Sequence, residues 1–267
     1  MKKSTKIALI LAVCGVGCCV AAGIMGVGSV LKQGVQLGIS AAESQEPTQQ
    51  QVLDVQGDKI AVELDLDYSK VTIQAGDSWH LSCGSDVHSY TEGNTLKIEQ
   101  EKNRPILKWK EPTPVVLTVP NEALLSMEID LDAGSVDMSG ISLPGMLQCS
   151  VDAGRVHMTD MTVSGGCTLD CDAGQIDFSG IVHGRTDIEC DVGEIRMDLQ
   201  PGSTIGRVQG DADLGTCHIL IDGKSYVNQD TLSESIAAEL PHMPGNDLLT
   251  VDCDAGAVTV SLYSKAS

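Results

Sequence analysis

An Asp-x-Gly tripeptide recurs along the chain at a nearly constant spacing, between short runs in which apolar and polar residues alternate. The clearest copies read LDAGSVDM, VDAGRVHM, CDAGQIDF, CDVGEIRM and CDAGAVTV. The aspartates, spaced by 20, 20, 19, 22 and 41 residues, are Asp132, Asp152, Asp172, Asp191, Asp213 and Asp254. A fixed period near 20 residues with strand-like alternation indicates a β-solenoid, in which each repeat is one coil stacked on the last.

The residues around each aspartate predict two short strands per coil. Apolar side chains stand one and three positions before it and four and six positions after it, as Cys149, Val151, Val156 and Met158 do around Asp152. A period of two places these side chains on one face of a strand, pointing inward. The predicted fold is all-β: a single-stranded β-solenoid (β-helix) with coils of about 20 residues.

Between the two strands the chain must bend, and we interpret the repeated aspartate and glycine as a structural corner. Glycine adopts a positive φ without steric cost, and the aspartate can accept hydrogen bonds from backbone N–H groups of the turn. The predicted corner glycines are Gly134, Gly154, Gly174, Gly193, Gly215 and Gly256. The alternative is a calcium ladder formed by the six aspartates, but the nonapeptide GGxGxD calcium repeat is absent from the sequence.

The solenoid should begin with an atypical coil and a β-rich cap. The segment LDLDYSKVTIQAGD fits the apolar columns but has Ser69 at the glycine position. After it, HLSC, TLKIEQ and PVVLTVP are expected to form an N-terminal cap that holds Trp79 and Trp109. Near the other end, LSESIAAEL at 232–240 is predicted to be a helix inside the insertion that precedes the last coil.

The N-terminal region predicts a membrane anchor. Residues 1–6 form a cytoplasmic tail with three lysines, and Ile7 to Leu31 run for 25 residues without a charge. At about 1.5 Å per residue this helix would cross the bilayer, with the body at 52–267 outside the cytoplasm. Residues 32–51 read as a flexible linker. A cleaved secretory signal is an alternative, because VAA at 20–22 and SAA at 40–42 resemble cleavage sites, and a lipoprotein is a weaker one.

Charge is distributed unevenly along the chain, and this excludes nucleic acid as a partner. Residues 1–42 carry four lysines and no acid, so the remainder holds all 37 acids against 13 bases, a net charge of −24. Such a body repels nucleic acid and attracts cations, cationic peptides or basic proteins of the cell envelope.

Two further columns of repeated residues are candidates for a functional site. Asp137, His157, Asp177, Arg196 and His218 should form an outward ladder of alternating acids and bases, which we interpret as a register-setting surface. The sequence contains neither G-x-S-x-G nor H-E-x-x-H, so we expect no enzyme and no cofactor. Five inner-column cysteines act most simply as small hydrophobes, although stacking would bring Cys171 and Cys190 within disulfide range.

The repeated DAGxVxM motifs, VTIQAGD near the start and TVP at 118–120 resemble the putative-adhesin family of bacterial β-strand-repeat proteins, over roughly residues 52–267. The resemblance implies a solenoid outside a bacterial membrane, sometimes linked to envelope stress, and no catalytic residues. We therefore expect a non-enzymatic binding or scaffold module in envelope sensing. A cell-surface adhesin is the alternative, and a polysaccharide-acting β-helix enzyme is a second one, although the regular corners predict no cleft.

Overall fold

The computed structural model describes residues 49–53, 55, 57–101, 111–212, 216–229, 236–240, 243 and 245–264. All the regular structure in these residues is β, which confirms the predicted class. The strands are β1 Gln49–Val52, β2 Ile60–Ala75, β3 His80–Cys83, β4 Val87–Glu92, β5 Thr95–Gln100, β6 Thr113–Val119, β7 Leu124–Ser139, β8 Ser142–Leu143, β9 Leu147–Val163, β10 Cys167–Val182, β11 Thr186–Leu199, β12 Ile205–Ala212, β13 Thr216–Ile221, β14 Lys224–Gln229, β15 Ile236–Glu239, β16 Asp247–Cys253 and β17 Ala257–Leu262.

The predicted N-terminal segments lie outside the described residues. They comprise the tail at 1–6, the membrane anchor at 7–31 and almost all of the linker at 32–51. In the part of the chain that the structure describes, no helix has the length and apolar character needed to cross a membrane. The anchor and its alternatives therefore stay predictions.

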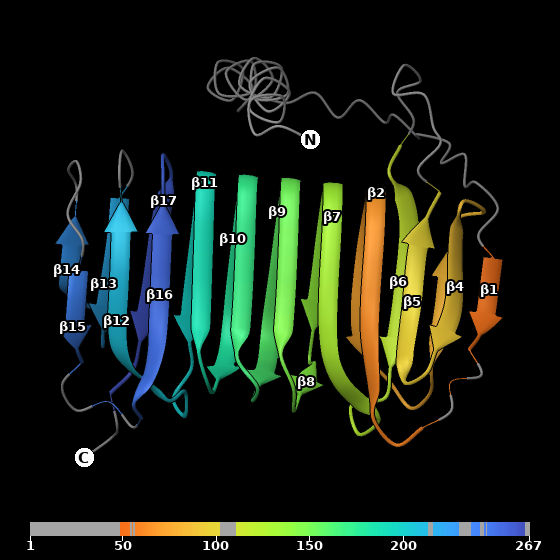
Figure 1. The fold of residues 1–267 in the computed structure, drawn as a ribbon, viewed down its shortest axis with the longest axis horizontal. Coiled ribbons are helices and arrows are strands. Elements are labelled where there is room, and N and C mark those ends of the chain that lie inside the picture. Colours follow the sequence, from red (N-terminus) through yellow and green to blue (C-terminus); the bar gives the residue numbers. More distant parts are fainter. Residues whose placement is uncertain are drawn as a thin grey trace, which may run out of the picture. The chain divides into compact units, whose positions relative to one another are not determined.

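The central repeats form parallel coils stacked in register (Figure 1). Strands β7, β9, β10 and β11 each follow a whole repeat through its Asp-x-Gly bend, and equivalent residues pair from coil to coil. Thus Val136 pairs with Val156, Val156 with Ile176, and Ile176 with Ile195. The pairing continues on both sides of the bend without a register shift there, so the bend lies within one long strand.

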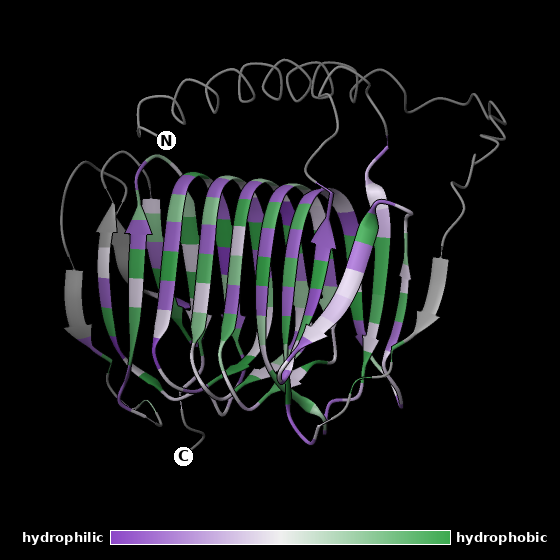
Figure 2. Cartoon of the chain, turned by 45° about the vertical axis from the view of Figure 1, so that its right-hand side comes forward, coloured by the Kyte–Doolittle hydropathy of each residue, from purple (hydrophilic) through white to green (hydrophobic). Residues whose placement is uncertain are grey.

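The core lies between the two halves of each coil. Figure 2 shows the long ribbons arching from one side of the body to the other, with apolar and polar residues alternating along them. In β9 the side chains of Cys149, Val151, Val156 and Met158 are all at most 1% exposed, as the predicted columns require. Burying these columns of apolar side chains is the main hydrophobic contribution to the stability of the body.

The repeated glycines are required for a reason that the sequence prediction only partly identified. A positive φ was expected at all of them, but among the described corner glycines it is clear only at Gly134, whose φ is 131°, while that of Gly174 is near extended at 159°. The shared constraint is close approach of backbones. A Cβ added to Gly154 would lie 2.3 Å from the Gly134 carbonyl oxygen, and one on Gly174 would lie 2.1 Å from that of Gly154. Gly215 and Asp213 lie outside the described residues.

We predict that Gly154→Ala destabilises the body by about 1–3 kcal/mol, because the neighbouring carbonyl of Gly134 must move away and the coils must separate locally. Urea unfolding of the full-length chain in detergent, followed by circular dichroism, measures this. The matched control is Gly210→Ala, whose new Cβ would meet its nearest neighbour at 3.7 Å, an ordinary contact. Equal stability losses in the two variants would contradict the backbone-clash explanation.

The N-terminal end confirms the predicted atypical coil and cap. Strand β2 is the first coil, and its buried Ser69 pairs with Gly134 in the glycine column. Strands β5 and β6 then continue the parallel stack on the outer side of β2. Beyond them β3, β4 and β1 pair antiparallel, which ends the solenoid. Trp79 is buried in this end, whereas Trp109 lies outside the described residues.

Gln100 closes the outer end of the corner column. Its side-chain oxygen accepts hydrogen bonds from the backbone N–H groups of Asp67 and Tyr68 and from the Ser69 hydroxyl. Its amide nitrogen donates to Asp86 and Thr113, both of which are also buried. Within the described ranges of the chain, no further Asp-x-Gly bend stacks on the outer side of the first coil. The Gln100 amide therefore provides the hydrogen-bond partners for the bend of that coil.

We predict that Gln100→Leu lowers the free energy of unfolding by about 3 kcal/mol, because it leaves several buried donors and acceptors without partners. Gln74→Leu is the control, since the Gln74 amide lies on the exposed surface beside Thr118 and its loss should change stability by less than about 0.5 kcal/mol. The same urea titration compares them. A Gln100→Leu variant as stable as the control would show that the buried network contributes nothing.

At the C-terminal end the order of coils in space differs from the order in sequence. Strands β16 and β17 return from the end of the chain and pair on one side with β11 and on the other with β12 and β13. The coil of Asp254 therefore stacks directly on that of Asp191, and the expectation that each repeat stacks on the preceding one is wrong here. In Figure 1 the returning strands stand between β11 and the outermost strands.

The predicted helix at 232–240 is also wrong where the structure describes it. Residues 236–239 form strand β15, which pairs antiparallel with the edge of β12, and Gly210 pairs with Ile236. Strand β14 likewise pairs antiparallel with β13. The open sheet edge offers backbone hydrogen bonds that override the local helix propensity of LSESIAAEL.

Candidate functional site

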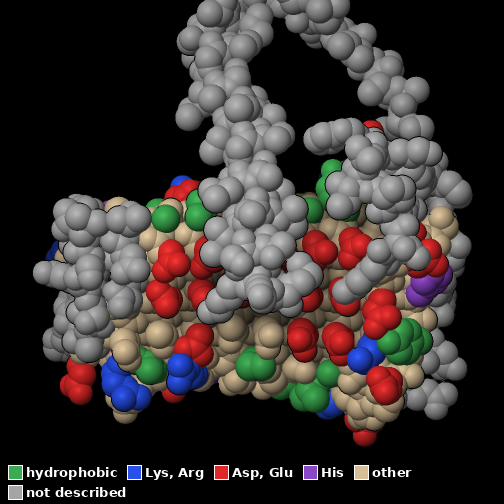
Figure 3. Space-filling view, turned by 45° about the horizontal axis from the view of Figure 1, so that its top comes forward, with side chains coloured by type: hydrophobic (Ala, Val, Ile, Leu, Met, Phe, Trp, Pro, Cys, Tyr) green, Lys and Arg blue, Asp and Glu red, His purple; other side chains and the backbone are tan. Residues whose placement is uncertain are grey.

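One side of the solenoid carries a dense array of acids, which we call the acidic face. It consists of the outward positions in the first half of six coils, at the Asp of each bend (Asp67 in the first coil) and two and four residues before it. Fourteen of these eighteen positions are acidic and none is basic: Glu63, Asp65, Asp67, Glu128, Asp130, Asp132, Asp152, Asp170, Asp172, Asp187, Glu189, Asp191, Asp252 and Asp254. Figure 3 shows acidic side chains in rows along the body.

In-register stacking places these carboxylates in columns. Adjacent strands lie about 4.8 Å apart, so neighbouring ionised acids repel by roughly 0.9 kcal/mol in water-like surroundings. Burial and then the charge of Glu189 raise the pKa of Asp170 to about 6. Burial and neighbouring acids also raise the pKa values of Glu189 and Asp191. The ionised forms of these three carboxyls are therefore disfavoured, which is a local electrostatic strain at neutral pH.

Two cations relieve this repulsion at the margins of the face. Arg185 Nε donates to both carboxylate oxygens of Asp187, at 2.9 and 2.7 Å, and holds the pKa of Asp187 below its usual range. At the cap, Lys97 Nζ lies 3.2 Å from Glu63 Oε2. None of the eighteen outward positions that define the acidic face is itself a lysine or an arginine.

The structure extends the predicted aspartate ladder to a wider surface. The described corner aspartates lie in one exposed or half-buried column, as expected. A second column, which includes Asp130, Asp170, Glu189 and Asp252, was missed, although the alternation two residues before each corner would have identified it. Among the described residues, no group of three or more His, Cys, Asp or Glu side chains is arranged to hold a metal ion.

The other side of the coils carries both signs of charge, and we call it the mixed-charge face. Asp137, His157, Asp177 and Arg196 pair in register as predicted. The last step of the predicted ladder is wrong, because Thr259 of the returning β17 separates Arg196 from His218.

Asp177 is the centre of the polar contacts on the mixed-charge face. Its carboxylate lies 3.1 Å from Arg155 Nη2 and 3.7 Å from Arg196 Nη1, and Gln175 Nε2 also donates to it at 3.3 Å. These contacts link the coils of β9, β10 and β11. The face therefore carries bound pairs of charges, in contrast to the repelling columns on the other side.

The cysteines of the body are core residues. All seven outside the predicted anchor are buried free thiols, which agrees with the interpretation that they act as small hydrophobes. Cys171 pairs with Cys190 in register, and Cys190 with Cys253. A hydrogen bond with Cys253 and burial both raise the pKa of Cys190, so this thiol stays protonated at neutral pH.

We predict that the melting temperature of the body rises as pH falls from about 7.5 to about 5. An acid whose folded pKa is raised stabilises the fold below its unfolded pKa and loses that contribution as pH rises through the folded value, here between 3.8 and about 6 for Asp170. Asp170→Asn should raise the melting temperature at pH 7.5 by about 2–4 °C and reduce its pH dependence.

The control for this experiment is Asp137→Asn, which removes the same charge from the mixed-charge face. Differential scanning fluorimetry at both pH values measures the effect. A melting temperature that is equal or lower at pH 5 for the unmodified chain, or that Asp137→Asn raises as much as Asp170→Asn does, would contradict the proposed strain.

Comparison with known proteins adds a family match and several distant structural likenesses. The family model described as Toastrack DUF4097 matches residues 51–262. No curated protein matches the sequence. A crystal structure of a putative cell adhesion protein from Clostridium sporogenes is 12% identical, with a TM-score of 0.49, over 81% of this chain and 99% of that one.

Two other solved structures align over a similar length. A putative adhesin from Bacteroides fragilis is 11% identical, with a TM-score of 0.30, over 80% of this chain and 95% of that one. A putative lipid binding protein from Parabacteroides distasonis is 11% identical, with a TM-score of 0.23, over 80% and 96%.

Proposed function

This chain belongs to the Toastrack DUF4097 family, and we propose from its surface that it is a non-enzymatic binding module of the cell envelope whose acidic face holds a basic partner. The partner would be a cationic peptide or a basic domain of an envelope protein, and the binding would serve sensing or a stress response. The observation that carries this proposal is the acidic face, on which fourteen of eighteen outward positions are acids and none is a base.

The physical argument is relief of repulsion. Carboxylates in columns at about 4.8 Å spacing repel one another, and burial together with this repulsion raises the pKa values of Asp170, Glu189 and Asp191. A partner that brings lysine or arginine side chains between the columns replaces repulsion by attraction. The charge of −24 over the chain beyond residue 42 also attracts such a partner over a longer range and accelerates association.

The location is part of the proposal. The uncharged run from Ile7 to Leu31, preceded by three lysines, would anchor the chain with its body outside the cytoplasm. A linker of about 20 residues spans roughly 25 Å as a coil, so the acidic face would act close to the membrane surface. A cationic peptide that approaches the membrane would then meet the acidic face.

We predict that the full-length chain, kept in a non-ionic detergent, binds a lysine- and arginine-rich peptide with an affinity that falls about tenfold or more between about 50 mM and about 500 mM salt. Neutralising four acids of the acidic face, with Asp130→Asn, Asp170→Asn, Glu189→Gln and Asp252→Asn combined, should weaken binding at low salt by a similar factor. Isothermal titration calorimetry measures both effects.

The control variant has the same net charge but keeps the acidic face. It combines Asp58→Asn, Glu122→Gln, Asp137→Asn and Asp160→Asn, four acids outside that face. The proposal requires the control to bind nearly as tightly as the unmodified chain. Equal weakening in the two variants would mean that only net charge matters, and salt-independent or absent binding would refute the proposal outright.

A further inference from the structure

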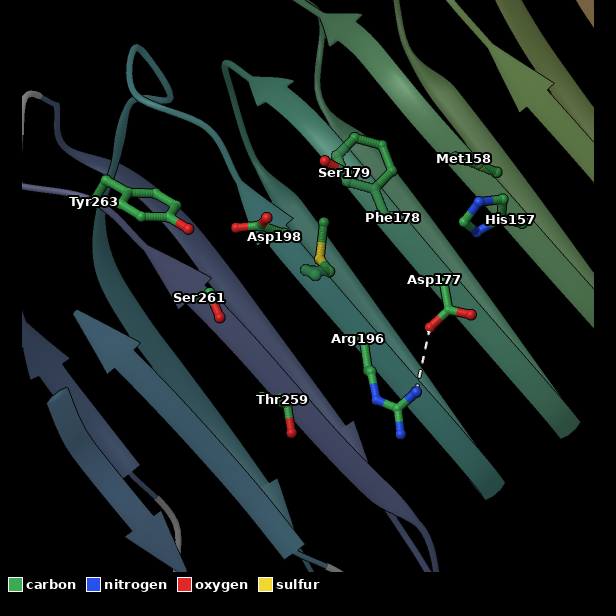
Figure 4. A pocket seen from close by; sticks show the side chains of 11 residues that line it. His157, Met158, Asp177, Phe178, Ser179, Arg196, Asp198, Thr259, Ser261 and Tyr263 are labelled. Atoms are coloured by element: carbon green, nitrogen blue, oxygen red, sulfur yellow. Dashed lines mark ion pairs between the residues drawn. The ribbon is translucent and has the colours of Figure 1, made fainter. Parts of the chain in front are cut away.

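A depression of about 390 Å³ lies on the mixed-charge face, and Figure 4 shows the side chains that line it. Its polar lining comes from His157, Asp177, Arg196, Asp198, Ser261 and Tyr263, which stand on or directly after four neighbouring strands. The volume falls in the range of small-molecule sites in proteins, about 300–1,000 Å³. The prediction from the regular corners that the solenoid has no cleft is therefore incomplete.

The depression exists because the last coil returns into the stack. Thr259 and Ser261 stand on β17 in register with Arg196 and Asp198 of β11, and Tyr263 follows directly after β17. The surface is lowest where the side chains are short, at Ser179, Thr259 and Ser261, and we call this part of the depression the low area. The side chains around it are larger. Tyr263, 37% exposed, stands at one side of this area, and His157 belongs to the opposite side on β9.

The polar groups of the depression are held in place by the scaffold. Asp177 is fixed by Arg155, Arg196 and Gln175. The Tyr263 hydroxyl donates to Asp198, and this hydrogen bond raises the pKa of Tyr263. Two buried atoms at the lining have no hydrogen-bond partner among the described residues, Nδ1 of His157 and Oδ1 of Asp198. Buried polar atoms without partners are rare in folded proteins, and these two leave hydrogen-bonding capacity unused beside the depression.

The chemistry of the lining selects the class of ligand. Asp177 is paired with Arg196 and Asp198 accepts a hydrogen bond from Tyr263, so the lining offers little unpaired charge, and the acidic body repels an anion. A cation would bind more strongly to the acidic face. The remaining class is a neutral molecule rich in hydroxyl groups, which can donate hydrogen bonds to carboxylates and accept them from a guanidinium group. The half-exposed ring of Tyr263 adds an apolar surface on which the C–H groups of a sugar ring can pack.

We propose that the depression between His157 and Tyr263 is a binding site for a neutral saccharide of one or two rings. Tyr263 packs on the sugar ring, and Arg196 and the hydroxyl groups of Thr259 and Ser261 bond to its hydroxyls. Binding is weak, with a dissociation constant of about 1 mM, because the site is small and open on one side. The site is independent of the acidic face and of any basic partner.

The test is saturation-transfer difference NMR on the full-length chain in a polyoxyethylene detergent, whose headgroup is not a sugar. Lactose, maltose and chitobiose are the probes, each at about 5 mM, above the expected dissociation constant. At least one should receive saturation from the protein, and its signal should persist between about 50 mM and about 500 mM salt, because no charge is paired on binding. Binding of a basic peptide to the acidic face should weaken over the same range.

The variants that locate the site are Tyr263→Ala and Thr259→Tyr, which remove the ring and fill the low area, respectively. Each should reduce the affinity for the bound probe about tenfold or more. The matched control is Tyr90→Ala, which removes a 45% exposed tyrosine from the N-terminal cap and should leave saturation transfer unchanged. Absence of transfer to all three probes, or transfer that neither site variant reduces while both remain folded by circular dichroism, would overturn the proposal.

Discussion

The in-register stacking of parallel coils, made possible by the glycine column, is the constraint on which the rest of this structure depends. At Gly154 and Gly174 the backbones of neighbouring coils approach so closely that no Cβ fits between them. Only with this contact can the ladder of hydrogen bonds continue through the bend of every coil. Register then places each apolar residue on an apolar residue of the next coil, so the core is a set of continuous apolar columns.

The same register governs the surface, because every outward residue lies next to its equivalents in the neighbouring coils. An acid at an equivalent position of several coils forms a column of acids, and the charges of this face repel one another. On the other face acids and bases alternate, which gives contacts such as that between Asp177 and Arg196. One backbone arrangement thus supports one surface that is strongly acidic and another on which acids and bases are paired. A binding module built in this way has two faces that can serve different ligands.

Much of this fold could be predicted from the sequence. The repeat period and the alternation of apolar and polar residues determine, within each coil, which side chains point inward and where the chain bends. Val151, Val156 and Met158 are buried as their positions require, and Ser69 takes the place of a corner glycine. The aspartate column of the acidic face was also predictable from the repeat. The second column, with Asp170 and Glu189, follows from the same alternation once the outward positions are read together.

What the sequence could not predict depends on contacts between distant segments. The 41-residue interval before Asp254 indicates an insertion, but nothing in a repeat period says which side of the stack a returning strand will join. Because Thr259 and Tyr263 reach the mixed-charge face only through that return, the depression could not be predicted either. The strand at 236–239 and the role of Gln100 likewise arise at the ends of the stack, where edge pairing overrides local propensity.

The position of β16 and β17 also has a consequence for the order in which the molecule can be assembled. These strands are synthesised after β12 and β13, yet they lie between β11 and the pair β12 and β13. During synthesis, which starts at the N-terminus, the first coils can stack as soon as they are made. Strands β12 and β13, in contrast, lack their parallel pairing partners until β16 and β17 have been synthesised. The part of the stack from β12 to β17 can therefore be completed only after synthesis of the chain has passed residue 262.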